Sequence, residues 1–143
     1  MSTLAAIDPG RCKCGLVLAD PGQALVLEAG VLPPERCRTL MQRWLKDQAC
    51  RGVVLGNGTG SAPWRHWLSQ LDLQLIVVPE AGTTLAARQR YWQLEPARSW
   101  RRLLPQGLRL PPRDVDDVVA QILLERHLGH PLHRRAEQTL LQP

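Results

Sequence analysis

The sequence contains no phenylalanine and only one tyrosine, so five tryptophans supply nearly all of its aromatic volume. It also lacks any apolar run near the ~18 residues that a membrane-spanning helix needs, and no hydrophobic segment follows a basic start as in a secretory signal. These absences predict a cytoplasmic protein with no membrane partner. The remaining composition is that of an ordinary globular protein, with 143 residues, 44% of them hydrophobic. This length suits one domain with a sizeable core.

The cysteines form no Cys-x-x-Cys pair, and the histidines cluster far from most of them, toward the C-terminus. The four cysteines are Cys12, Cys14, Cys37 and Cys50. A zinc site needs four convergent ligands, and a site made from all four thiols is one alternative. Reduced thiols of a cytosolic protein are the interpretation that we favour.

Positive charge exceeds negative charge, with a net charge of +5 and an isoelectric point near 9.6. The excess is concentrated between residues 88 and 113, where seven arginines accompany one acid, Glu95. The seven are Arg88, Arg90, Arg98, Arg101, Arg102, Arg109 and Arg113. Such a pattern favours a polyanionic partner, most simply nucleic acid. A solvated basic loop with no partner is the alternative.

The most informative stretch lies at the start of the chain, where a short apolar run, 4–7, ends at Asp8. A Pro-Gly turn follows, and a second apolar run occupies 16–19. Short apolar runs bounded by Gly and Pro predict buried strands joined as a hairpin. A carboxylate at the end of a buried strand is costly unless cations or donors compensate it, and the loop carries Arg11 and Lys13. Asp8 could instead cap the turn through its own backbone.

The remainder of the chain alternates between helical and strand patterns. The predicted elements are a strand at 24–32, a helix from Pro34 to about 49, a strand at 52–55, a helix at 63–71, a strand at 73–78, a helix from a Thr83 or Thr84 cap to about 92, an irregular segment at 95–113, and a helix capped by Asp114 and ending near 129. This order predicts an α/β fold with a five-stranded mixed sheet, an antiparallel meander followed by parallel strands, flanked by helices. We expect residues 1–129 to form the domain and 130–143 a basic and polar tail.

Four acidic residues stand out because of where they fall in this order. Asp8 and Glu80 follow strands, and Asp116 and Asp117 lie in the first turn of the last helix. Ligands collect at the carboxyl ends of parallel strands, so these carboxylates are expected to meet and to bind Mg²⁺ or Mn²⁺. Paired ions of this kind can hold the attacking and leaving oxygens of a phosphodiester. The alternatives are an exposed loop position for Glu80 and compensation of the helix dipole by the two aspartates.

The segments 6–20, 52–57, 77–88 and 115–124 resemble the YqgF-type, Holliday-junction-resolvase-like nucleases of the ribonuclease H-like superfamily, some of which are pre-16S rRNA nucleases. The resemblance implies a ribonuclease H-like fold and metal-dependent cleavage of nucleic acid. It implies that Asp8, Glu80 and Asp116 are catalytic, and it ranks Asp117 second as a metal ligand. This chain departs from the family after Glu80, where Ala81 stands in place of the usual arginine.

The missing basic group could be supplied by Arg11, Lys13 or Arg88. The sequence therefore predicts a metal-dependent endonuclease acting on rRNA precursor or branched DNA. A non-catalytic nucleic-acid-binding module on the same fold is the alternative, with the basic segment as its phosphate-binding surface.

An ATPase of the sugar-kinase type could use Gly56 and Gly60 in a second phosphate loop, but such proteins normally need two domains of this kind. The choice between RNA and DNA, and between monomer and homodimer, stays open. Exposed tryptophans could form a dimer contact, although their apolar stripes favour the core.

Overall fold

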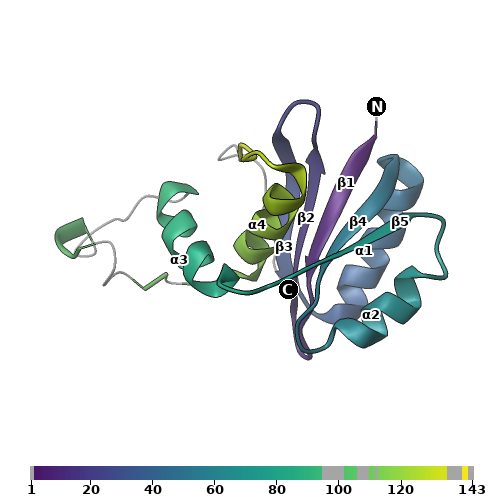
Figure 1. Cartoon of the computed structure of the whole chain (residues 1–143), viewed down its shortest axis with the longest axis horizontal. Coiled ribbons are helices and arrows are strands. Elements are labelled where there is room, and N and C mark those ends of the chain that lie inside the picture. The colour runs from purple at the N-terminus through teal and green to yellow at the C-terminus, as the bar shows by residue number, and fades with distance from the viewer. Residues whose placement is uncertain (1, 95–101, 106–109, 112, 135–139, 142–143) are drawn as a thin grey trace.

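The computed structural model describes residues 2–94, 102–105, 110–111, 113–134 and 140–141. The chain forms a mixed sheet with the strand order β5-β4-β1-β2-β3-β6 and helices on both faces (Figure 1). The strands are β1 (Thr3–Asp8), β2 (Cys14–Asp20), β3 (Leu25–Leu32), β4 (Cys50–Gly56), β5 (Gln74–Val78) and β6 (Leu140–Leu141). The helices are α1 (Pro34–Asp47), α2 (Ser61–Leu68), α3 (Thr83–Leu94) and α4 (Asp116–Leu128).

The first three strands form the antiparallel meander, because two tight turns return the chain beside itself. β1 pairs with β2 in a register that places Asp8 opposite Gly15. The second turn is held by Asp20, whose Oδ1 accepts hydrogen bonds from the backbone amides of Gly22 and Gln23. This is the local turn chemistry that aspartate favours. The meander makes β2 a central strand, buried along its whole length.

The two later strands extend the sheet from the other side of β1. β4 pairs parallel to β1, and β5 pairs parallel to β4. Each reaches its place through a helical crossover, as parallel pairing requires. The predicted five-stranded mixed sheet is therefore confirmed, and β6 adds a two-residue parallel pair to β3 that the sequence did not predict.

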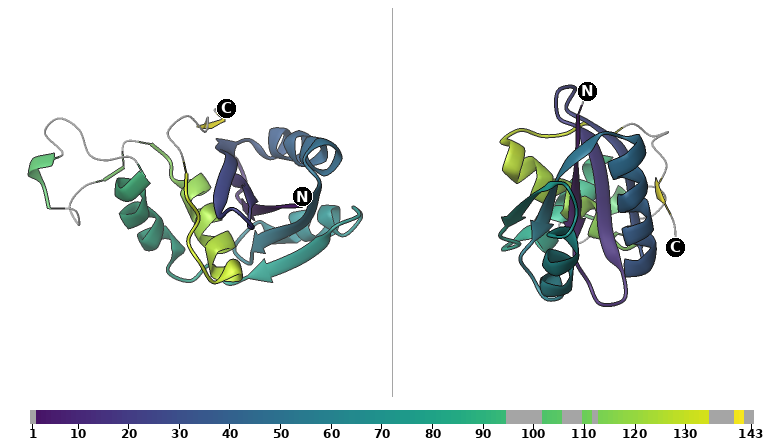
Figure 2. Two further views of the ribbon diagram at one scale, coloured as in Figure 1. Left: turned by 90° about the horizontal axis from the view of Figure 1, so that it is seen from above. Right: turned by 90° about the vertical axis from the view of Figure 1, so that its right-hand side faces the viewer.

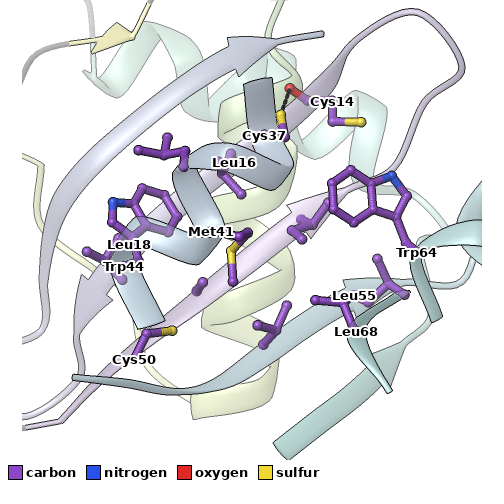
Figure 3. Close-up of a cluster of buried hydrophobic side chains, with 14 of the residues drawn as sticks. Cys14, Leu16, Leu18, Cys37, Met41, Trp44, Cys50, Leu55, Trp64 and Leu68 are labelled. Carbon is purple, nitrogen blue, oxygen red and sulfur yellow. Dashed lines mark hydrogen bonds between the residues drawn. The ribbon is translucent and has the colours of Figure 1, made fainter. Parts of the chain in front are cut away.

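Two hydrophobic cores lie on the opposite faces of the sheet, with α1 and α2 on one face and α4 on the other (Figure 2). Trp44 and Trp64 fill the first core together with Met41 and three buried thiols (Figure 3). On the second face α4 lies against the sheet and α3 packs on α4. Trp92 is also buried, on α3. These three tryptophans therefore supply core volume, as their spacing indicated.

All four cysteines are free thiols, with Cys12 exposed and the other three buried. Each buried thiol donates to a nearby carbonyl oxygen, as Cys14 does to Gly10 and Cys37 to Leu32. Cys50 does the same with Gly52. The thiols thus behave as small core residues with weak donors. Within the described residues, no helix has the length and apolar character needed to cross a bilayer.

The start of α4 differs from the sequence prediction. Asp114 does not cap this helix, whose N-cap residue is Val115 and which has no side-chain cap. The Asp114 carboxylate instead forms an ion pair with Lys13 in the loop after β1. A tertiary partner has therefore replaced the local capping bond. The end of the helix agrees with the prediction, since Gly129 adopts φ 79° as its C-cap.

Residues beyond this helix also pack onto the domain. The backbone of His133 exchanges hydrogen bonds with Ala24 and Val26 at the start of β3. Leu132 is buried in the second core. The first part of the predicted tail thus contributes to the packing of the domain.

Candidate active site

Three of the predicted acidic residues meet at one edge of the sheet. Asp8 is the last residue of β1, and Glu80 follows β5 by two residues. Because β1, β4 and β5 run parallel, their carboxyl ends share this edge. Asp116 reaches the same place from the first position of α4. The charges of Glu80 and Asp116 both act on Asp8. We call these three residues the carboxylate cluster.

Asp8 is the central member of the cluster. Burial first, and then repulsion from Glu80 and Asp116, raises the pKa of Asp8 from 3.8 to about 8. Burial likewise raises the pKa of Asp116, an effect that the Lys13 ammonium opposes. The protein therefore concentrates negative charge here, and without a cation it relieves the repulsion by keeping a proton on Asp8.

The backbone of Glu80 is fixed by hydrogen bonds, and its side chain is fixed by close packing against two glycines. Its amide donates to the Asn57 side chain, 3.1 Å away, and its carbonyl accepts from the amide and hydroxyl of Thr83, at 3.0 and 2.7 Å. Its carboxylate lies over Gly56 and Gly58, where an added Cβ would come within 1.9 Å of a carboxylate oxygen in each case. The two glycines thus make the space that Glu80 occupies. Its Oε1 is buried and has no hydrogen-bond partner.

Asp116 is placed by close contact between α4 and the sheet. A Cβ on Gly15 would lie 1.8 Å from the Asp116 carbonyl oxygen, so only glycine lets the helix start approach β2 this closely. Residue 15 is also the partner of Asp8 across the hairpin. The same residue therefore brings the helix start next to the end of β1, which explains how two carboxylates far apart in sequence become neighbours.

Asp117 departs from the expectation that it would join this cluster. Its side chain is fully buried and binds two arginines, Arg113 through Oδ1 at 2.8 Å and Arg134 through Oδ2 at 2.7 Å. Successive residues of a helix point about 100° apart, so Asp117 faces away from Asp116. With both oxygens committed to guanidinium groups, Asp117 serves the packing of α4.

The predicted basic residues divide into several groups. Arg11 and Lys13 lie exposed in the loop directly after Asp8, and Arg88 is exposed on α3. Arg102 is also exposed. Arg113 instead is partly buried, binds Asp117, and places its guanidinium carbon 5.1 Å from the centroid of the Tyr91 ring. Arg98, Arg101 and Arg109 lie outside the described residues.

One basic residue near the site was missed by the sequence reasoning. Arg126 on α4 donates to the carbonyl oxygens of Ala81 at 3.0 Å and Pro79 at 3.4 Å, which flank Glu80. No sequence pattern indicates this contact, because Arg126 lies in the last turn of a helix and its partners lie more than forty positions earlier in the chain. Arg126 steadies the loop that carries Glu80.

The donor set suits a hard divalent cation. All members of the cluster are carboxylates, the ligands that Mg²⁺ and Mn²⁺ prefer, and one oxygen of Glu80 is buried without a hydrogen-bond partner. Among the described residues, no group of three or more His, Cys, Asp or Glu side chains is arranged so that it could hold a metal ion. The residue types of the cluster therefore suit a hard cation, whereas their arrangement in this structure does not form a coordination site.

No protein-family model and no curated protein matches the sequence. Among solved structures, the chain is similar to T. thermophilus RuvC in complex with Holliday junction substrate, at 14% identity and a TM-score of 0.48, covering 89% of this chain and 96% of RuvC. It is also similar to the catalytic core domain of BIV integrase, at 14% identity and a TM-score of 0.38, covering 85% and 81% of the two chains. Such values describe a distant likeness in chain trace and say nothing about this chain's own residues.

The strand order itself defines the class of the fold. A three-stranded antiparallel meander, extended beside β1 by two parallel strands and flanked by helices, is the ribonuclease H-like arrangement. The fold class implied by the sequence resemblance is thus confirmed, and the YqgF-type family within that class stays a prediction.

Proposed function

We propose that this chain is a divalent-metal-dependent endonuclease of the YqgF type that cleaves phosphodiester bonds in structured nucleic acid, either rRNA precursor or branched DNA. The observation that carries the proposal is the carboxylate cluster. Three acidic side chains from β1, the loop after β5 and α4 are brought together at a cost that shows in the raised pKa of Asp8. Groups so perturbed tend to lie at functional sites, where the cost is retained for chemistry.

In this proposal Asp8, Glu80 and Asp116 hold Mg²⁺ or Mn²⁺. The ion would supply charge neutralisation at the scissile phosphate and acidify the attacking water. Asp8 must give up its proton when it becomes a ligand, which makes binding of the ion dependent on pH. Glu80 contributes an oxygen that has no other partner, and Asp116 contributes one from a helix start fixed against Gly15.

Binding of the nucleic acid would fall to exposed cations beside the cluster. Arg11 and Lys13 lie within five residues of Asp8, in a loop that borders the turn after β4, where a Cβ on Gly60 would come within 3.8 Å of Gly10. Arginine and lysine at such a rim neutralise backbone phosphates without reading sequence. They could provide the basic group that the family places after Glu80.

The test is a cleavage screen on an rRNA precursor and on four-way DNA junctions with Mg²⁺, Mn²⁺ or EDTA, comparing the natural protein with Asp8→Asn. We expect cleavage of one substrate class with metal, and none with EDTA or with Asp8→Asn. Binding without cleavage under every condition would favour the non-catalytic binding module. Asp8→Asn that cleaves as well as the natural protein would refute the role of the cluster.

A further inference from the structure

A buried polar network joins α4 to the residues that follow it. Asp117 and Gln121 are both fully buried, and the Arg134 side chain is only 8% exposed. The Arg134 guanidinium donates from Nη1 to Asp117 at 2.7 Å, and from Nε and Nη2 to the Gln121 side-chain oxygen Oε1 at 3.1 and 2.7 Å. Arg134, which follows the end of α4, thus binds side chains on two consecutive turns of this helix.

The position of Arg134 along α4 is fixed by hydrogen bonds of the two residues before it. The preceding residues, Leu132 and His133, form hydrogen bonds on both sides of the chain. Leu132 donates to Glu125 at 2.6 Å and accepts from Gln121 at 3.3 Å. His133 donates to Ala24 at 2.7 Å beside β3. The segment 132–134 therefore ties α4 to the sheet, with Arg134 as its contact nearest to the helix start.

The start of α4 needs such a contact. Val115 provides no side-chain cap, and an uncapped helix end leaves its first amides without partners and tends to fray. The first intrahelical bond runs from the Val119 amide to the Val115 carbonyl, at 2.9 Å. Asp116 lies inside this first turn, so fraying there would displace the one carboxylate of the cluster that comes from a helix.

Two sets of contacts hold this turn. The Asp116 backbone lies against Gly15. Asp117 is bound by Arg113, which precedes the helix, and by Arg134, which follows it. Buried ion pairs gain little net stability, and in some proteins their role is to fix one geometry. We propose that Arg134 is a positioning residue of the carboxylate cluster, since it fixes the first turn of α4 through Asp117 and thereby the carboxylate of Asp116. The link to metal binding rests on the proposed function, whereas the link to the helix start does not.

The chain offers a matched control at the other end of the same helix. Arg90 donates to Glu125 at 3.0 Å and to the Leu132 carbonyl at 3.1 Å. This pair is also largely shielded, with side chains 23% and 11% exposed. Arg90→Gln removes a comparable pair without touching Asp117. Arg134→Gln should remain folded because Arg113 still compensates Asp117.

The first measurement is hydrogen exchange without metal, in the full chain, at two amides of α4. Val119 reports on the helix start and Gly129, bonded to the Glu125 carbonyl at 2.8 Å, reports on its end. We expect Arg134→Gln to speed exchange at Val119 at least tenfold and to affect Gly129 much less. Arg90→Gln should show the reverse order, and Arg134→Lys, which keeps the charge, should fall between. Equal acceleration at both amides in Arg134→Gln, or none at Val119, would overturn the proposal.

The second measurement is the Mn²⁺ concentration that gives half of the maximal thermal shift, together with kcat and KM. Arg134→Gln should raise that concentration about tenfold and lower kcat with little change in KM, whereas Arg90→Gln should leave it unaltered at a similar loss of Tm. Faster Val119 exchange with unaltered Mn²⁺ binding would refute the coupling to the cluster. If the natural protein shows neither a metal shift nor cleavage, the proposed function fails, and the exchange experiment still decides whether Arg134 fixes the helix start.

Discussion

Asp8→Asn should stabilise the metal-free protein, and the gain should grow with pH. The folded-state pKa of Asp8 is about 8, against 3.8 for an unperturbed aspartate. The folded protein therefore binds this proton more tightly than the unfolded chain does. The favourable contribution of that proton is complete below about pH 4 and is lost as the pH rises through 8, with a slope of about 1.4 kcal/mol per pH unit.

Between pH 5 and pH 8 this slope corresponds to about 4 kcal/mol as an upper bound. Asp8 keeps some contact with solvent and is coupled to its neighbouring carboxylates, so the measured change should be about 2 to 3 kcal/mol. Asparagine has nearly the same shape and cannot ionise. The stability difference between Asp8→Asn and the natural protein should therefore widen by that amount over this range.

The assay is urea unfolding in EDTA at pH 5 and pH 8, with Asp72→Asn as a control for the loss of an exposed carboxylate. A millimolar Mg²⁺ or Mn²⁺ arm should raise the Tm of the natural protein by mass action, and Asp8→Asn should abolish that rise. A stability difference that is the same at pH 5 and pH 8 would show that Asp8 does not hold a proton in the folded state, and it would refute the reasoning.

Three further changes test how the cluster is built. Gly58→Ala should push the Glu80 carboxylate aside, since its Cβ would lie 1.9 Å from Oε2. We expect this variant to lose the metal-induced rise in Tm and the cleavage activity, with a change in stability within about 1 kcal/mol. The control Gly22→Ala, in an exposed turn, should keep the metal-induced rise and the cleavage activity. Gly15→Ala should lower stability by about 1 to 3 kcal/mol, measured by urea unfolding, because its clash is with the rigid backbone of Asp116. An unchanged midpoint would contradict that packing. Replacing Arg98, Arg101 and Arg102 together by Ala should weaken nucleic-acid binding and reduce the salt slope by up to about 3; an unaltered slope would remove them from the interface.

The sequence predicted the placement of those candidate site residues that lie at strand ends. Asp8 and Glu80 each follow a short apolar run and a turn signal, so topology alone brings them to one edge. Asp116 was placed with them because the pattern of the last helix begins there. The fold was predictable for the same reason, since the turns and the alternation of elements admit few topologies.

The neighbouring carboxylates could not be told apart from sequence. Asp114, Asp116 and Asp117 all lie near a helix start, and each suits a cap, a ligand or a dipole partner by residue type alone. Their roles are set by partners far away in the chain. Asp114 forms an ion pair with Lys13. Asp117 forms one with Arg134, which lies beyond the end of the helix. Such long-range contacts leave no periodic signal in the sequence.

Under the proposed function, the first turn of α4 would serve both stability and chemistry. Asp116 faces a cluster that destabilises the metal-free fold through repulsion, while Asp117, about 100° around the helix, is fully compensated by two arginines. Lys13 offsets the charge of Asp116 only in part, because burial still leaves the pKa of Asp116 raised. In our proposal, the buried network of Asp117, Gln121 and Arg134 holds the same helix turn in place against this cost. The cost and the contact that would offset it then lie on adjacent residues.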